Sequence, residues 1–226
     1  MTATPTARRR WPQILATVAV VVVLAIGGII YFGSRAATRT ATPTVTSSPS
    51  ATSTISADPA PTGCLGGSSR DAAMVLTAQK TAPHTTNGAV EVATAFTRWI
   101  QRFPYPDAAE AAKLSTRIMA KPSFTDDLTA YLAASPDLSG GIVPKGTNYY
   151  MSTVPGVWHL ESGSADKVVA SLGTGFVIDG TLSTTLRSSI TVRLAWQGGV
   201  WKIADANGTR TTQELYTIGT AFTGGC

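Results

Sequence analysis

Two histidines are the side chains of this sequence best suited to acid–base chemistry, because imidazole titrates close to neutral pH. His84 lies in a loop-like Ala-Pro-His-Thr stretch, and His159 follows Trp158 in a segment with strand character. Neighbouring side chains of a strand point to opposite faces, so His159 should face away from the interior if Trp158 faces it. We therefore expect structural roles for both histidines.

The carboxylates have local explanations as well. Asp126 and Asp127 look like paired catalytic acids, but they fall at the start of a predicted helix, where free N–H groups and the helix dipole stabilise acidic side chains. Similar reasons, at helix starts or turns, account for Asp107, Glu110, Asp179 and Asp205. We predict no catalytic residue and no enzymatic activity.

Metal and cofactor motifs are missing from the sequence. It has no His-x-x-x-His or Cys-x-x-Cys spacing, and two histidines are too few for a cluster. The glycines at 140–141 and 173–175 lack the strand–loop–helix context of a phosphate loop, and no Gly-x-Ser-x-Gly turn is present. We predict no metal site and no cofactor.

Aromatic side chains are the remaining candidates for a binding site. They can line an apolar pocket or fill the core, and core filling is the commoner role. The residues that we consider as pocket lining are Trp99, Tyr149, Trp158, Phe176 and Trp196. The sequence leaves both alternatives open.

The elements that would position these residues are preceded by a long uncharged block. Residues 13–33 contain no charged side chain, and as a helix they would span about 30 Å, the thickness of a bilayer's hydrocarbon core. Arg8, Arg9 and Arg10 precede the block and aromatic residues stand at both borders, which is typical of a transmembrane helix with a cytoplasmic N-terminus. We predict a cytoplasmic arm over residues 1–12, a single-pass membrane helix over 13–33 and a C-terminal domain outside the cytoplasm. A cleavable signal peptide is the alternative, and it delivers the rest of the chain to the same side.

The net charge of +5 belongs mainly to the N-terminal part of the chain. Residues 1–62 carry five arginines and one aspartate, whereas residues 63–226 carry 13 Lys/Arg against 12 Asp/Glu. Phosphate binding requires a concentrated basic surface. We therefore expect no direct nucleic-acid binding by the C-terminal part.

A change of composition separates a linker from a folded domain. Residues 34–62 are mostly Thr, Ser, Ala and Pro, and they cannot bury enough apolar surface to offset the entropy of ordering. We predict a disordered linker there and a domain over residues 63–226. The only two cysteines, Cys64 and Cys226, stand at the ends of that domain, and outside the cytoplasm they should form a disulfide. A lipid anchor on Cys64 is disfavoured, because Pro61 stands where a lipobox has an aliphatic residue.

Periodicity predicts about three helices followed by about four strands. Apolar residues recur three or four apart over residues 88–103, and further helices should begin at Asp107 and near residues 123–125. Alternating apolar and polar residues predict strands over residues 149–162, 166–178, 187–197 and 200–205. Residues 70–79 are ambiguous between helix and strand. The sequence thus predicts an α+β domain with helices packed on a curved antiparallel sheet.

The closing strand reads Val-Trp-Lys-Ile-Ala-Asp at residues 200–205, after a long alternating strand and a glycine turn. With the preceding helices, this order resembles the NTF2-like (cystatin-like cone) superfamily over residues 88–205. That fold implies helices in the concave face of a bent antiparallel sheet. With one membrane helix added, the chain is similar to inner-membrane scaffold proteins of type IV secretion and conjugation systems. It is also similar to membrane-anchored actinobacterial proteins of unknown function.

The resemblance implies a scaffold or assembly module of a conjugative DNA-transfer apparatus, and it carries over no catalytic residue. Such a module would associate with itself or with other proteins, and it would contact the bilayer through the N-terminal helix. The alternative is a ligand-binding or sensory domain of the cell envelope that uses the pocket of the NTF2-like fold.

Overall fold

The computed structural model describes residues 58–208 and 210–226, which belong to one compact unit, Thr54–Cys226. The predicted arm (1–12), membrane helix (13–33) and most of the predicted linker (34–62) lie outside the described residues. No helix in the described part of the chain is long and apolar enough to cross a membrane. The Asp58 carboxylate accepts a hydrogen bond from the Thr85 hydroxyl at 2.8 Å, so the domain's contacts begin before the predicted boundary at residue 63.

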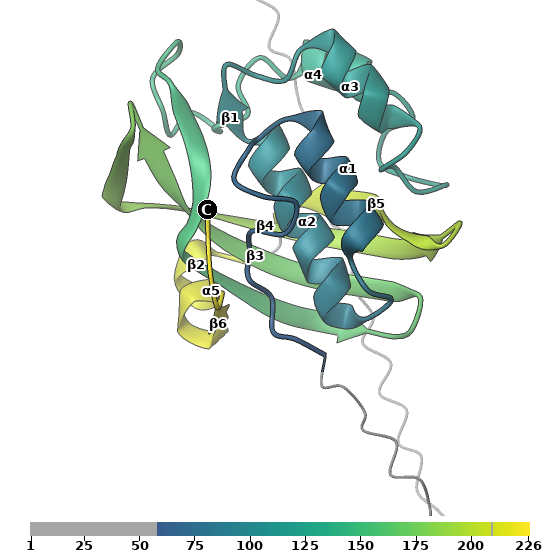
Figure 1. Ribbon diagram of the computed structural model, residues 1–226. Helices are drawn as coiled ribbons and strands as arrows, with labels where there is room; N and C mark the ends of the chain where they lie inside the picture. The colour runs from purple at the N-terminus through teal and green to yellow at the C-terminus, as the bar shows by residue number, and fades with distance from the viewer. Residues whose placement is uncertain (1–57, 209) are drawn as a thin grey trace, which may run out of the picture. The chain divides into compact units, whose positions relative to one another are not determined.

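The described residues form an α+β domain with five helices and six strands (Figure 1). The helices are α1 (Ala72–Thr81), α2 (Thr86–Ile100), α3 (Ala108–Ser115), α4 (Leu128–Ala134) and α5 (Thr212–Ile218). The strands are β1 (Arg102–Phe103), β2 (Tyr149–Gly163), β3 (Lys167–Ile178), β4 (Thr181–Gln197), β5 (Val200–Asn207) and β6 (Thr220–Ala221). The predicted α+β class is confirmed, whereas three helices and four strands were too few.

Helix α1 is the segment that the sequence left undecided. Its buried residues share one face, but that face includes the polar Gln79, and the apolar Ala73 and Leu76 lie outside it, so hydrophobicity alone marks no clean stripe. The Asp71 side chain caps it by accepting a hydrogen bond from the Met74 amide at 2.8 Å. The buried Gln79 amide donates to the Trp201 carbonyl at 2.9 Å, which ties α1 to β5.

Helix α5 lies beyond the last long strand and was not predicted. It begins with a capping box in which the Thr211 hydroxyl and the Glu214 carboxylate each bond the other's backbone amide. Its buried residue, Leu215, packs against Gly173 of β3. A Cβ at Gly173 would lie 2.7 Å from a ring carbon of Tyr216, so the close approach of α5 requires glycine there.

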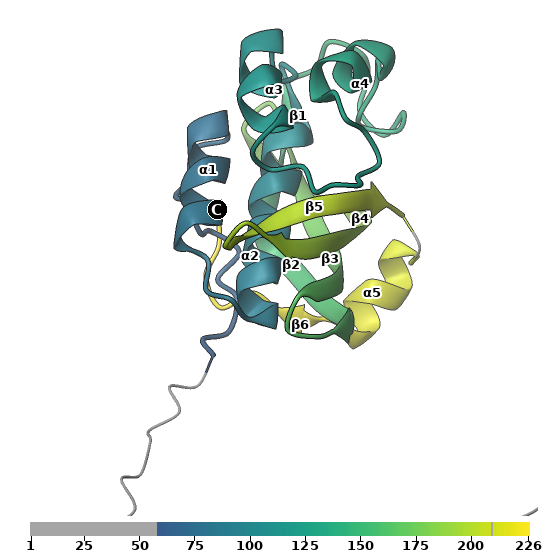
Figure 2. The ribbon, with the colours of Figure 1, turned by 90° about the vertical axis from the view of Figure 1, so that its right-hand side faces the viewer.

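The strands form one antiparallel sheet in the order β1-β2-β3-β4-β5, and β6 pairs with β2. The sheet is curled, with α1 and α2 on one face and α5 on the other (Figure 2). Leu172 of β3 is fully buried in the main core under the helices, whereas the next residue, Gly173, faces α5. Register shifts between Ser152 and Val157 mark an irregularity that bends β2.

The main core fills the space between the helices and the sheet. Phe96 and Trp99 of α2 and Trp201 of β5 have no exposed surface. Thirteen of the residues of α2, from Gly88 to Ile100, are buried, because α1 covers the side of α2 that the sheet leaves open. The interior that an NTF2-like pocket would occupy is therefore taken up by core side chains.

A connecting segment covers the outer edge of β5. The Ile203 amide donates to the Ile118 carbonyl at 2.7 Å, and the Ala120 amide donates to the Ile203 carbonyl at 2.8 Å. The Phe124 amide continues the pairing on the Ala204 carbonyl at 2.9 Å. These bonds satisfy backbone groups that an uncovered edge would offer to another chain.

A second, smaller core lies where β3 and β4 extend past α2 as a hairpin, on the left of Figure 1. Its buried residues are Val143, Tyr149, Met151 and Phe176, with Phe103, Tyr105, Ile178 and Leu186 packed against them. The connection between α4 and β2, residues 135–148, contributes Val143. This second core supports the candidate site.

Candidate ligand-binding site

A cavity of about 370 Å³ lies against the second core. Its lining residues come from β1 and the segment after it, from the 135–148 connection and from the start of β2: Phe103, Tyr105, Pro136, Asp137, Ser139, Val143, Pro144, Lys145, Gly146, Thr147 and Tyr149. We call it the Tyr149 cavity. Its size is in the range of small-molecule sites, and such sites combine apolar walls with a few polar groups.

Tyr149 is the most unusual residue of this lining. It is only 3% exposed, and its hydroxyl is buried without a hydrogen-bond partner among the described residues. Burial is the main reason that its pKa is raised above the usual value, and the neighbouring Tyr105 and Asp137 add to the shift. The hydroxyl therefore stays protonated at neutral pH and can donate a hydrogen bond. A buried donor without an acceptor costs about 1–3 kcal/mol, which a ligand with an acceptor atom would recover.

Asp137 forms the polar wall of the cavity. Its Oδ1 accepts hydrogen bonds from the Ser139 amide at 2.8 Å and the Ser139 hydroxyl at 2.7 Å, and its Oδ2 accepts from the Gly141 amide at 2.7 Å. The bonds from Ser139 are the main reason that the pKa of Asp137 is lowered. The carboxylate is thus charged at neutral pH, and these bonds shape the turn that places Ser139 and Val143 in the lining.

Tyr105 links the two sides of the cavity. Its hydroxyl accepts a hydrogen bond from the Leu138 amide at 3.1 Å and reaches Asp137 Oδ1 at 3.4 Å. Its ring meets Phe103 edge-on, with centroids 5.3 Å apart. The aromatic wall is therefore fixed to the 135–148 connection by polar contacts at its tip.

The five aromatic residues considered as pocket lining do not share one site. Tyr149 lines the cavity, and Phe176 supports it from behind, with ring centroids 5.9 Å apart. Trp99 lies in the main core, where its indole N–H donates to Glu110 at 3.3 Å. Trp158 and Trp196 are partly buried and also pack against the main core. Position in the tertiary structure, rather than residue type, separates lining from core.

The histidines lie outside the cavity lining. His84 Nε2 is 3.0 Å from Asp166 Oδ1, and the His84 ring stacks on Trp196 with centroids 3.9 Å apart. His159 stands opposite Ser171 in the β2–β3 ladder, while the preceding Trp158 packs against the main core. Neither histidine reaches the Tyr149 cavity, so the cavity has no imidazole base.

The acids at the element ends serve local roles. Asp107 and Asp127 cap α3 and α4 by accepting hydrogen bonds from backbone amides at 2.8 Å. Asp205 pairs with Arg193 on the neighbouring strand, and Asp179 occupies the β3–β4 turn with a φ of 46°. None of these carboxylates belongs to the cavity lining.

Among the described carboxylates, Glu161 of β2 has the pKa that is lowered most. Its hydrogen bonds to Arg210, and then to the Ser171 hydroxyl at 2.6 Å, lower its pKa to about 2. A carboxylate with so low a pKa is a poor general base near neutral pH. The Glu161–Arg210 pair therefore fastens the segment before α5 to the sheet and offers no catalytic group.

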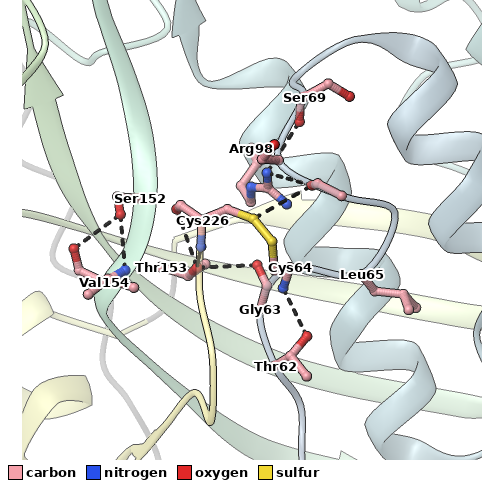
Figure 3. Close-up of a disulfide and its surroundings, with 12 residues drawn as sticks. Thr62, Gly63, Cys64, Leu65, Ser69, Arg98, Ser152, Thr153, Val154 and Cys226 are labelled. Carbon is pink, nitrogen blue, oxygen red and sulfur yellow. Dashed lines mark hydrogen bonds between the residues drawn. A yellow bond between two sulfur atoms is a disulfide. The ribbon is translucent and has the colours of Figure 1, made fainter.

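The cysteine pair joins the two ends of the domain (Figure 3). Cys64 and Cys226 form a disulfide with their Cα atoms 5.4 Å apart, in the arrangement that the sequence predicted. Thr153 of β2 holds both of the chain segments that the disulfide joins. Its amide donates to the Cys226 carbonyl at 3.0 Å, and its hydroxyl donates to the Gly63 carbonyl at 3.2 Å.

Tyr105, Asp137, Ser139 and Lys145 line the cavity but were not predicted from the sequence. Two signals were available. Residues 135–148 form a long connection without regular structure, and connections longer than about 12–15 residues are often functional. The Asp-Leu-Ser pattern at residues 137–139 is also typical of a side-chain-stabilised turn. Neither signal identifies the partner surface on β2.

Because comparison with known proteins finds no match, the kind of site is assigned from its geometry. No protein-family model, curated protein or solved structure matches this chain. Among the residues that the structure describes, no group of three or more His, Cys, Asp and Glu could hold a metal ion. The site is defined by an apolar cavity with one buried hydroxyl and one fixed carboxylate at its wall.

Proposed function

We propose that the domain is the ligand-binding part of a membrane-anchored protein of the cell envelope, and that the ligand occupies the Tyr149 cavity. The observation that carries the proposal is a 370 Å³ cavity lined by Tyr149, a residue whose buried hydroxyl has no hydrogen-bond partner among the described residues. The ligand would be a small, largely apolar molecule with a hydrogen-bond acceptor for this hydroxyl. Phe103, Tyr105 and Val143 supply apolar contacts of the kind that such a molecule needs.

The location of this site differs from the pocket that the NTF2-like resemblance implies. That pocket lies between the helices and the concave face of the sheet, a region filled here by Phe96, Trp99 and Trp201. The Tyr149 cavity lies at the start of β2, next to the 135–148 connection. Ligand binding would therefore leave the main core undisturbed and would act on the connection.

We expect Tyr149→Phe to weaken binding of the fluorescent probe 8-anilinonaphthalene-1-sulfonate about 10- to 150-fold, because one hydrogen bond to a charged acceptor contributes about 1.5–3 kcal/mol. The ring, and with it the apolar contact, is kept. Titration of the probe into the full-length protein in a nonionic detergent measures the change. Native mass spectrometry of protein purified from its own membranes would identify the natural ligand.

The matched control for this experiment is Tyr216→Phe. Tyr216 is a half-buried tyrosine of α5 whose hydroxyl donates to the Pro155 carbonyl at 3.3 Å, away from the cavity lining. It should leave the affinity unchanged. Equal affinities for wild type and Tyr149→Phe would contradict a ligand hydrogen bond from Tyr149.

An assembly module, of the kind implied by the resemblance to type IV secretion and conjugation scaffolds, is the second candidate. Apolar side chains on the surface favour it: Val154 is 53% exposed and Leu182 is 41% exposed, and both lie close to Pro155 at the bend of β2. Leu182→Lys should then reduce the yield of homo- or hetero-oligomers crosslinked in intact cells at least severalfold. Recovery of the monomer alone from wild-type cells would count against this candidate.

A further inference from the structure

A groove of about 450 Å³ lies where α1, the segment after α3 and the start of β5 meet. Gln79 of α1 joins these three elements, because its side-chain amide donates to the Arg117 carbonyl at 3.0 Å and to the Trp201 carbonyl at 2.9 Å. The β4–β5 turn lies beside α1 (Figure 2), and the Gln197 side chain before this turn bonds the backbone N–H and C=O groups of Lys121 at 2.9 and 3.0 Å. These bonds fix the walls of the groove.

Each of the three elements contributes one basic side chain to the lining: Lys80 from α1, Arg117 after α3 and Lys202 from β5. No aspartate or glutamate lines the groove, and no ion pair among the described residues involves any of the three. The helix dipole accounts for a lysine in the last turn of α1, but it does not account for Lys202 on a strand. We call this site the basic groove.

The charges around the basic groove do not cancel this surplus. An adjoining depression adds one cation and one acid, Lys121 and Asp126, which balance each other. Asp166, on the β2–β3 hairpin, lies 3.0 Å from His84 Nε2, and Asp71 caps the opposite end of α1. The basic groove therefore keeps three positive charges that the described residues leave unpaired.

The predicted membrane tether joins the domain at the same end of α1. The Asp58 carboxylate accepts a hydrogen bond from the Thr85 hydroxyl at 2.8 Å, and Thr85 caps α2 directly after the turn that follows α1. Lys80 lies in the last turn of α1, beside that connection. Residues 34–57 span at most about 85 Å when fully extended, so the predicted membrane helix would hold the domain within that distance of the bilayer.

We propose that the basic groove binds the phosphate of an anionic phospholipid headgroup, so that the domain docks on the bilayer to which it is anchored. This inference rests on the proposed membrane anchor and is independent of the Tyr149 cavity. Each basic residue near an anionic lipid surface favours binding about fivefold, so three together favour it about 100-fold. The tether also raises the effective concentration of the lipid surface, so a weak contact is sufficient.

Lysine reactivity in the full-length protein tests the proposal. The protein is reconstituted in nanodiscs of phosphatidylcholine alone or of a two-to-one mixture with phosphatidylglycerol, and it is treated briefly with a neutral acylating reagent. Mass spectrometry should find that Lys80 and Lys202 react at least about tenfold more slowly in the anionic discs. Lys145, outside the basic groove, should react equally in both discs and is the internal reference. High salt should remove the difference.

Arg117→Gln should reduce the protection of Lys80 about fivefold. The matched control is Arg187→Gln, which removes the same charge about 30 Å along β4 from Gln197 and should keep the protection.

Three results would overturn docking on the bilayer. The first is equal lysine reactivity in the two kinds of disc. The second is equal protection by inorganic phosphate in phosphatidylcholine discs, which would assign the groove to a free anion. The third is protection by poly-glutamate alone, which would assign it to an acidic protein. Failure of the protein to enter the discs would instead refute the membrane anchor on which the proposal rests.

Discussion

Replacing Cys64 by serine is expected to lower the free energy of unfolding by about 3–5 kcal/mol. The disulfide closes a loop with a sequence separation of 162 residues, and a loop of this size removes about 5 kcal/mol of unfolded-state entropy in the chain-entropy model. The bond also aligns Gly63 and Cys226 on Thr153 of β2. Without it, the two chain ends would be held by hydrogen bonds alone.

Urea unfolding of the full-length protein, followed by tryptophan fluorescence, measures this loss. The double variant Cys64→Ser/Cys226→Ser should match the single variant, and reduced wild type should match both, because all three lack the same bond. Oxidised wild type should be unaffected by a thiol-blocking reagent applied under native conditions, since both sulfur atoms are bonded. A loss below about 1 kcal/mol in all three reduced forms would contradict the structural role of the disulfide.

Glu91→Gln is expected to cost about 2–4 kcal/mol, although it changes no volume. Glu91 is 7% exposed and accepts hydrogen bonds from four donor groups of Thr62, Gly63 and Leu65. Glutamine turns one acceptor oxygen into a donor that faces these donors, and it removes the charge that strengthens the bonds. The loop at the disulfide, residues 62–70, would then lose its main polar attachment to α2.

A double-mutant cycle with Cys64→Ser tests whether the two attachments act on the same loop. The loss of unfolding free energy in the double variant should be smaller than the sum of the two single losses by more than about 0.5 kcal/mol. Each substitution alone already loosens the loop that the other loosens. Glu214→Gln, at the exposed cap of α5, is the control and should cost at most about 1 kcal/mol and add independently. Strict additivity of Glu91→Gln and Cys64→Ser would show that they stabilise separate parts of the domain.

The regular elements were largely predictable because their signals are local. The apolar stripe of residues 88–103 corresponds to α2, and the alternation from residue 149 onward corresponds to β2, β3 and β5 with ends shifted by a few residues. The long β4 was predicted only in its second half. Its first part, from Thr181, belongs to an exposed hairpin with few apolar residues. The alternation of apolar and polar residues that predicts a strand is therefore weak there.

The candidate site was only partly predictable. Tyr149 was considered because of its type, but the same reasoning also selected Trp99, which the structure buries in the main core. Asp137 and Lys145 form the other wall of the cavity, and in the sequence two helices, α3 and α4, lie between Phe103 and these residues. No local pattern could indicate that the 135–148 connection folds back over β1 and β2.

From the sequence alone followed the α+β class, the helix and strand periods and the pairing of Cys64 with Cys226. These depend on composition and on spacing along the chain, which the sequence displays directly. Only the tertiary structure decided that the interior is filled, that Tyr149 borders a cavity, and that Arg98 is buried with two of its nitrogens unpartnered among the described residues. Those properties depend on which distant segments exclude water from a side chain, and burial sets the free-energy cost of each unpaired polar group.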